Sequence, residues 1–309
     1  MTLERRRFRS SGGELAYVDA GEGVPVLLLH GFPTSAHLWR RLVPMLTPAF
    51  RAIAPDLLGY GDSAKPVDVE LHIRAQARYV RELVEHLGAD DIAVVGHDIG
   101  GGVAQLLAMD GGVRTLVLID AICFDAWPIE GVRLLQRAGA GEYDESFVRQ
   151  VLEVTFDLGM GHRHRLDDEA LAEYVRPWAA DPAALHRAAS GIDGVGLDGS
   201  EARLSDLGAR ALVLWGEDDP FLPASLAERL GETLPGASVA VLPGCSHFLI
   251  EDAPETVLPL IADYLRIHHL GARHAHAGPR FLDLGVSFER PGHGLEDPAA
   301  AGLGNGEEE

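Results

Sequence analysis

One acidic side chain stands where an apolar strand turns sharply into an apolar helix. Residues 94–102 read VVGHDIGGG, so glycines flank Asp98 on both sides. The apolar run before the turn predicts a short buried strand, and VAQLLAM after it begins a helix. A strand, a sharp turn and a helix present a single side chain at the apex, which is the geometry of a nucleophile elbow. Serine is the usual occupant, and an aspartate could instead cap the helix.

Two later segments place a carboxylate and a histidine directly after apolar runs. In WGEDDP, Asp218 and Asp219 follow one run, and in GCSHF, His247 follows the last one. The carboxyl ends of parallel strands lie at one edge of a sheet, where ligands of such sheets bind. We therefore expect these side chains to lie near Asp98. A nucleophile, an acid and a histidine in this order predict nucleophilic catalysis.

Strands and helices alternate along most of the chain. This alternation predicts a parallel sheet with helices on both faces. Strands are expected within 4–20 (two short ones) and at 24–29, 52–54, 91–95, 113–119, 211–215 and 238–242. Helices are expected at 36–46, 72–87, 103–109, 223–234 and 253–268.

The alternation breaks between residues 122 and 205, which contain short helical patterns and no clear strand. We interpret 122–205 as a helical cap that roofs the pocket at the carboxyl edge. Residues 1–121 and 206–270 then form the core domain. The last segment, 271–309, is expected to be a tail of low order. The histidine cluster around its start (His268, His269, His274 and His276) is a weaker candidate for a metal site.

Composition restricts the partners of the protein. With 309 residues and 47% hydrophobic side chains, the chain can bury a large core. Its formal charge of −21 disfavours nucleic acid and anionic membrane surfaces as partners. Cys123 and Cys245 cannot form a disulfide framework and suggest a reducing compartment. We find no signal peptide and no apolar run of the roughly 20 residues that span a bilayer. We therefore expect a soluble, cytoplasmic protein that acts on a small molecule without a cofactor or metal.

Five segments together resemble a known family. HGFP, DLLGYGDS, GHDIGG, WGEDDPFLP and GCSHF resemble α/β-hydrolases with a helical cap, in the branch of epoxide hydrolases and haloalkane dehalogenases. The resemblance covers about residues 8–268. It implies an α/β fold with a mostly parallel eight-stranded sheet, flanking helices and a cap inserted after the sixth strand.

The resemblance also implies roles for individual residues. Asp98 matches the nucleophile, Asp219 the acid and His247 the base of a catalytic triad. The backbone N–H groups of Phe32 and Ile99 match the oxyanion hole. Asp218 is the rival for the acid, and Asp120, after an earlier strand, is a second alternative.

A carboxylate nucleophile selects the chemistry. It is a poor nucleophile for esters, which argues against an esterase, but it can displace a halide or open an epoxide at an sp³ carbon. The product is an alkyl ester of the aspartate, which a histidine-activated water hydrolyses.

The leaving group separates the remaining alternatives. An epoxide needs a proton donor, for which Tyr143 and Tyr174 in the cap are candidates. A halide needs N–H donors, for which Trp127 and Trp178 are candidates, since Ile99 offers no side-chain donor. We expect an epoxide hydrolase-like enzyme acting on a small apolar substrate. A haloalkane or haloacid dehalogenase is the alternative, and a non-catalytic ligand-binding protein is the third hypothesis.

Overall fold

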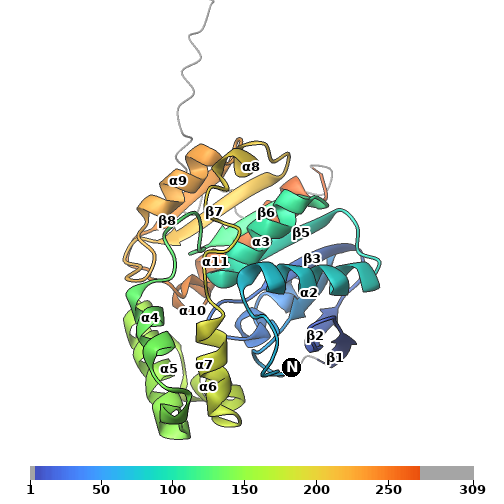
Figure 1. Ribbon diagram of the computed structural model, residues 1–309. Coiled ribbons are helices and arrows are strands. Elements are labelled where there is room, and N and C mark those ends of the chain that lie inside the picture. Colours follow the sequence, from blue (N-terminus) through green and yellow to red (C-terminus); the bar gives the residue numbers. More distant parts are fainter. Residues whose placement is uncertain (1–3, 272–309) are drawn as a thin grey trace, which may run out of the picture.

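The computed structural model describes residues 4–271 (Figure 1). Within them an eight-stranded sheet has the order β1-β2-β4-β3-β5-β6-β7-β8. The strands are β1 (Arg5–Arg9), β2 (Glu14–Ala20), β3 (Val24–Leu29), β4 (Phe50–Pro55), β5 (Ile92–His97), β6 (Val113–Ile119), β7 (Arg210–Gly216) and β8 (Ser238–Leu242).

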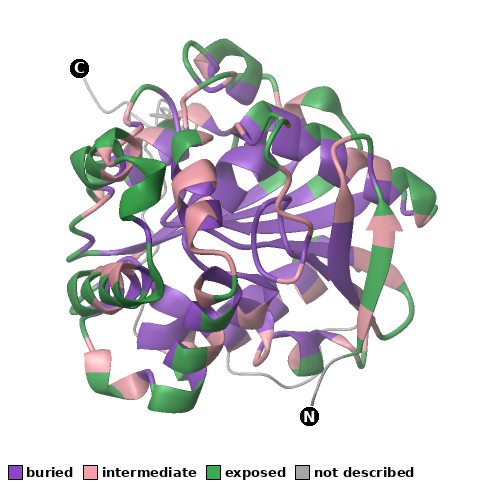
Figure 2. Ribbon diagram, turned by 60° about the horizontal axis from the view of Figure 1, so that its bottom comes forward, coloured by how far each residue is buried: buried purple, intermediate pink, exposed green. Residues whose placement is uncertain are grey.

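The sheet is parallel from β4 to β8, and β1 and β2 form an antiparallel edge. The central strands are mostly apolar, as expected where helices cover both faces of a sheet, and every residue of β5 is buried. Figure 2 shows this buried sheet running through the middle of the molecule. The carboxyl ends of the parallel strands therefore lie at one edge, and the loops that leave them build the site.

Helices pack on both faces of the sheet. Among them, α1 contacts α11, α2 contacts α3, α3 contacts α8, α8 contacts α9, and α10 contacts α11. These helices are η1 (Ala36–Trp39), α1 (Val43–Leu46), α2 (Ile73–His86), α3 (Ile99–Asp110), α8 (Glu201–Ser205), α9 (Ser225–Thr233), α10 (Leu249–Asp252) and α11 (Pro254–His268). None of the helices in residues 4–271 is long and apolar enough to cross a membrane.

Between β6 and β7 the chain leaves the sheet and forms a group of helices, which lie together at one end of the molecule in Figure 1. We call α4 to α7 the inserted helices. They comprise α4 (Glu130–Arg137), η2 (Ala140–Glu142), α5 (Glu145–Gly159), η3 (Arg163–Arg165), α6 (Asp168–Ala179) and α7 (Pro182–Ser190). The predicted fold class is confirmed: an eight-stranded, mostly parallel sheet with flanking helices, interrupted after the sixth strand.

One predicted element is wrong in detail. Instead of a continuous helix over 36–46, the structure has a short 3₁₀ helix and a separate helical turn. Pro44 lies at the start of that turn, where its ring and missing N–H prevent an earlier helix from continuing through it. The predicted low-order tail, 272–309, lies outside the described residues.

Candidate active site

Asp98 lies between β5 and α3 with φ 51° and ψ −120°. Non-glycine residues rarely adopt such a conformation, and backbone strain of this kind collects at functional sites. Two glycines make the turn possible. A Cβ at Gly96 would overlap the carbonyl oxygen of Gly100, and one at Gly100 would overlap that of Leu29. The Asp98 side chain makes no capping hydrogen bond to α3, so the geometry gives no support to a helix-capping role.

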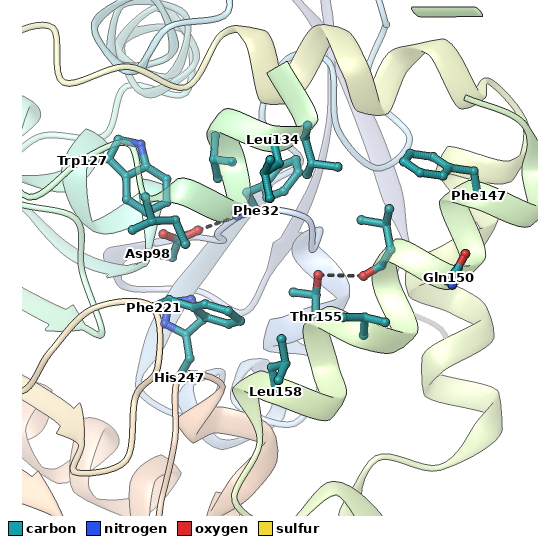
Figure 3. Close-up of a pocket in the computed structure, with 16 residues that line it drawn as sticks. Phe32, Asp98, Trp127, Leu134, Phe147, Gln150, Thr155, Leu158, Phe221 and His247 are labelled. Atoms are coloured by element: carbon teal, nitrogen blue, oxygen red, sulfur yellow. Dashed lines mark hydrogen bonds between the residues drawn. The ribbon is translucent and has the colours of Figure 1, made fainter. Parts of the chain in front are cut away.

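The two oxygens of the Asp98 carboxylate are in different situations. The backbone N–H of Phe32, in the loop after β3, donates a hydrogen bond to Oδ2 at 2.8 Å (Figure 3). Oδ1 is buried and has no hydrogen-bond partner among residues 4–271. One oxygen is therefore held and the other is left free beside the cavity described below.

Burial raises the pKa of Asp98 to about 6, because water no longer stabilises its charge. The positive charge of protonated His247 opposes this rise. So do the backbone N–H groups of Phe32 and Ile99, which favour the charged form. The carboxylate is consequently ionised at neutral pH.

His247 and Asp219 form a buried pair. The Nδ1 of His247 lies 2.9 Å from Oδ2 of Asp219, and because a carboxylate only accepts, Nδ1–H is the donor. Asp219 is itself held through Oδ1 by the N–H groups of Phe221 and Leu222, at 2.8 and 3.0 Å. The neighbouring Asp218 is exposed. This arrangement leaves Nε2 of His247 as a proton acceptor.

The pKa of His247 is raised. Burial by itself lowers it, but the charge of Asp219, its hydrogen bond and the charge of Asp98 together outweigh burial. His97, the last residue of β5, contacts the backbone of His247. Burial lowers the pKa of His97 well below its usual value, so its ring is neutral. Its Nε2–H can donate to the backbone carbonyl of His247, 3.0 Å away, and this contact fixes the loop that carries His247.

Asp120 lies at the end of β6, also with positive φ, and is fully buried. Its Oδ1 accepts the N–H of Gly216 at 2.8 Å, which ties β6 to the end of β7. Its Oδ2 is buried and has no partner among the described residues. Burial, followed by the charge of Asp219, raises the pKa of Asp120 well above its usual value. This rise favours the neutral form of Asp120, and among the described residues no hydrogen bond joins Asp120 to His247.

A cavity of about 410 Å³ opens beside these groups. Asp98 and His247 supply the only ionisable side chains among the residues that line it. Aliphatic and aromatic side chains form nearly all of the remaining wall. The other lining residues are Phe32, Trp127, Ile129, Gly131, Val132, Leu134, Leu135, Phe147, Gln150, Val151, Val154, Thr155, Leu158 and Phe221. Figure 3 shows Asp98 and His247 on one side of this space and α5 on the other.

Of the four aromatic residues predicted to bind the substrate, the structure brings one to the cavity. Trp127 lines it, and its indole N–H is buried and has no partner among residues 4–271.

The other three have polar atoms that are bonded elsewhere. The Tyr143 hydroxyl donates to the carbonyl of Leu135 at 2.7 Å, and the Trp178 indole donates to the carbonyl of Pro33 at 2.8 Å. The Tyr174 hydroxyl donates to the buried carboxylate of Glu251 at 2.6 Å. None of these three residues lines the cavity.

Sequence reasoning missed most of the cavity wall. Phe221 stacks edge-on against the His247 ring, with centroids 5.1 Å apart. Its position two residues after Asp219 was the available signal. The α4 and α5 residues of the wall gave no signal, because their apolar pattern is that of an ordinary amphipathic helix. Among residues 4–271, no three His, Cys, Asp or Glu side chains are grouped so that they could hold a metal ion.

The model of the alpha/beta hydrolase fold family matches residues 24–254, three quarters of the chain, including every residue that lines the cavity. The chain belongs to this family. The curated relatives that it matches include enzymes of two related activities. It is 32% identical over 272 residues to haloalkane dehalogenase 2 of Mycobacterium tuberculosis, covering 84% of this chain and 94% of that protein. It is 31% identical over 271 residues to the soluble epoxide hydrolase of Corynebacterium sp. strain C12, covering 80% and 92%.

The chain is also similar to solved structures of such enzymes. The epoxide hydrolase CorEH without ligand is similar to this chain, with a TM-score of 0.73 and 26% identity. The match covers 85% of this chain and 99% of that one. The protein is therefore an α/β-hydrolase with dehalogenases and epoxide hydrolases among its relatives.

Proposed function

We propose that this hydrolase cleaves a bond at an sp³ carbon of a small, neutral, apolar substrate through a covalent ester on Asp98. One observation carries the proposal. The Asp98 carboxylate has one oxygen bonded to the Phe32 N–H and the other free, beside a cavity that His247 also lines. We further propose that residues 122–205 act as the cap of this cavity, over a core formed by 1–121 and 206–270.

In the first step, Oδ1 of Asp98 attacks the substrate carbon in line with the leaving group. The C–O bond forms while the bond to the leaving group breaks, and the leaving group keeps the electron pair. Oδ2, bonded to the Phe32 N–H, becomes the carbonyl oxygen of the new ester. A serine would instead suit acyl transfer, and no serine stands at this apex.

In the second step, Nε2 of His247 takes a proton from water, and the resulting hydroxide attacks the Asp98 carboxyl carbon. Negative charge develops on Oδ2, where the N–H groups of Phe32 and Ile99 stabilise it. A donor of this type is worth roughly 10²–10³ in rate. The intermediate then collapses and expels the alkoxide, which takes the proton from His247 and leaves as an alcohol. Asp219 holds the His247 ring in the orientation and tautomer that this step needs.

The leaving group that the contacts favour is a halide, whereas the sequence favoured an epoxide. An opening epoxide must be given a proton, but the hydroxyls of Tyr143 and Tyr174 already donate to other protein groups, and neither residue lines the cavity. A halide needs only a hydrogen-bond donor. The unpartnered indole N–H of Trp127, on the cavity wall, is such a donor. The haloalkane dehalogenase among the relatives supports a halide as the leaving group. The epoxide hydrolase among the relatives keeps epoxide opening as the second candidate.

A trapping experiment tests both parts of the proposal. The His247→Gln variant is treated with 1-bromobutane or with 1,2-epoxybutane, and peptides that contain Asp98 are weighed by mass spectrometry. We expect a butyl adduct from the bromide, because the ester forms and its hydrolysis is blocked. A hydroxybutyl adduct from the epoxide alone would reverse the order of the two substrates, and no adduct from either would refute the covalent mechanism. The Asp98→Asn, His247→Gln double variant is the control and should gain no mass.

A further inference from the structure

The inserted helices join the rest of the protein through two segments that meet at the start of α3. The outgoing segment, 120–129, runs from β6 to α4, and the return segment, 191–200, runs from α7 to α8. A Cβ at Gly102 would lie 2.7 Å from Cγ1 of Ile122 and 3.2 Å from Cδ1 of Leu197, so one side chain of each segment lies against this glycine. The position of the inserted helices depends on how these two segments are held.

Arg229, on α9, contacts both segments with one guanidinium group. Its Nη1 donates to Oδ1 of Asp125 at 3.0 Å, and its Nη2 donates to Oε1 of Glu201, the first residue of α8. The guanidinium carbon lies 4.0 Å from the centre of the Phe124 ring, which is a cation–π contact. One side chain thus joins the outgoing segment, the end of the return segment and α9.

The backbone at Phe124 is in a conformation that needs support. Phe124 is buried and has φ 53°, in the left-handed region that non-glycine residues rarely adopt. Such strain persists only where the surrounding contacts hold the backbone in place. Before Phe124, the Gln105 side chain of α3 donates to the carbonyl of Ile122 at 2.8 Å. At Phe124 and Asp125, the contacts with Arg229 hold the chain.

Trp127 follows two residues after Asp125 and lines the same cavity as Asp98 (Figure 3). Its indole N–H has no partner among residues 4–271, so no hydrogen bond of its own fixes the direction of the ring. The place of the ring therefore depends on packing and on the backbone that carries it. Arg229 does not line the cavity, and its side chain is 42% exposed. It can act on the cavity only through the segments that it holds.

We propose that Arg229 is a positioning residue, which holds both segments against α9 and thereby sets the place of the Trp127 indole in the cavity. This inference rests on the proposed function, in which Trp127 is the donor to the leaving halide. Exposed ion pairs contribute little to stability, so the contacts of Arg229 act on geometry more than on folding. Helix α9 itself is held by its buried residues, which include Leu226 and Leu230.

The place of Trp127 is measured by ¹⁹F NMR of protein labelled with 5-fluorotryptophan at its four tryptophans. The Trp127→Phe variant identifies the Trp127 signal. In Arg229→Gln this signal should shift or broaden, while the other three signals stay in place and show that the variant is folded. Arg81→Gln is the matched control and should move none of the four. Arg81 is also partly exposed, and it pairs with Asp110 at 3.3 Å, between α2 and α3.

Two further variants separate the contacts of Arg229 from its charge. Arg229→Lys keeps the charge but cannot bridge two carboxylates in the same fork geometry, so it should behave like Arg229→Gln. Glu201→Ala should move the Trp127 signal in the wild-type background and not in Arg229→Gln, because its effect passes through Arg229. A Trp127 signal that stays in place in Arg229→Gln, its full restoration by lysine, equal effects of Glu201→Ala in both backgrounds, or movement of all four signals would overturn the proposal.

Bromide binding links the place of Trp127 to the reaction. We expect the Kd for bromide, measured by calorimetry, to rise about tenfold in Arg229→Gln, because a hydrogen bond to an anion is lost. Arg81→Gln should keep the wild-type Kd. A Kd unchanged in Arg229→Gln but raised in Trp127→Phe would overturn the inference. Wild-type Kd in Trp127→Phe would instead refute the halide-donor role in the proposed function, and the NMR result on Arg229 would stand.

Discussion

Burial raises the pKa of Asp98 to about 6, and an ionised Asp98 therefore opposes folding at neutral pH. In the unfolded chain the group ionises at about its ordinary value of 3.8. Between these two pH values folding takes up a proton, so the stability of the protein falls as pH rises. Above about pH 6 the full destabilisation is present, and below the ordinary value it is absent.

Asp98→Asn should consequently stabilise the protein while abolishing turnover. Asn keeps an oxygen to accept the Phe32 N–H and never carries the buried charge. The difference between 3.8 and about 6 corresponds to about 3 kcal/mol at neutral pH. Urea unfolding of both proteins from pH 4 to pH 8 measures it. The gain should appear between about pH 4 and pH 6 and then level off, and a gain that does not vary with pH would assign the effect to packing instead.

Asp120 and Asp219 are two buried carboxyl groups with different predicted roles. Asp219 bonds to His247, whereas Asp120 bonds to the N–H of Gly216, and burial raises its pKa, which favours its neutral form. A neutral acid can be replaced by an amide of the same shape, and a carboxylate that orients a histidine cannot.

We therefore expect Asp120→Asn to keep the wild-type rate of ester hydrolysis. Asp219→Asn should lower this rate by roughly 10³–10⁴, because the wrong tautomer of His247 is then favoured. Single-turnover kinetics on a preformed ester measures both variants. A larger loss for Asp120→Asn than for Asp219→Asn would make Asp120 the working acid.

At the scale of elements, contacts from α5 and α6 fix the inserted helices to the loops of the site. Trp178 bonds to Pro33, beside Phe32, and Tyr174 bonds to Glu251, in the helix that follows His247. At the end of α5, the N–H groups of Gly161 and His162 donate to the carboxylate of Asp252, at 2.8 and 2.7 Å. The same contacts that hold these helices thus also hold the two loops that carry Phe32 and His247.

Tyr174→Phe distinguishes an anchor from a proton donor. As an anchor, the hydroxyl bonds to a buried carboxylate, so its removal should lower the free energy of unfolding by about 1.5–3 kcal/mol. Ester formation on Asp98 should proceed at the wild-type rate with bromide and epoxide alike. Chemical denaturation and single-turnover assays measure the two effects. A slower reaction with the epoxide alone, at unchanged stability, would show that Tyr174 is the proton donor to the opening epoxide.

The sequence predicted elements better than it predicted the cavity wall. Strands such as β3 and β6 were placed correctly because continuous apolar runs bounded by turn residues have few alternatives. The groups that follow strands were also predictable, since parallel strands bring their carboxyl ends together. The direction in which a helical side chain points could not be predicted from the sequence. Tyr143 and Tyr174 have the right chemistry, but their hydroxyls donate to the carbonyl of Leu135 and to the carboxylate of Glu251, and neither tyrosine lines the cavity.

At the scale of the whole molecule, the net charge of the chain and the lining of the cavity both disfavour anionic substrates. The chain carries a formal charge of −21, and no Lys or Arg lines the cavity. An anionic substrate would be repelled by the surface and would leave its carboxylate unpaired when buried, which costs several kcal/mol.

A haloacid should therefore be a poor substrate. We expect kcat/KM for 4-bromobutanoate to be at least about 10²-fold lower than for 1-bromobutane, because of the buried charge. Halide release at neutral pH measures both, with the methyl ester of the acid as a neutral control that should recover most of the loss. Equal rates for the acid and its methyl ester would contradict the electrostatic selection.

The covalent ester on Asp98 is tested most directly by one turnover of wild-type protein in H₂¹⁸O, with enzyme in excess over substrate. If water attacks the carboxyl carbon of the ester, the alcohol released in this turnover carries an unlabelled oxygen from Asp98. The peptide that contains Asp98 then gains one ¹⁸O, which mass spectrometry detects. Labelled alcohol together with an unlabelled Asp98 would mean that water attacks the substrate itself, and it would contradict the ester mechanism.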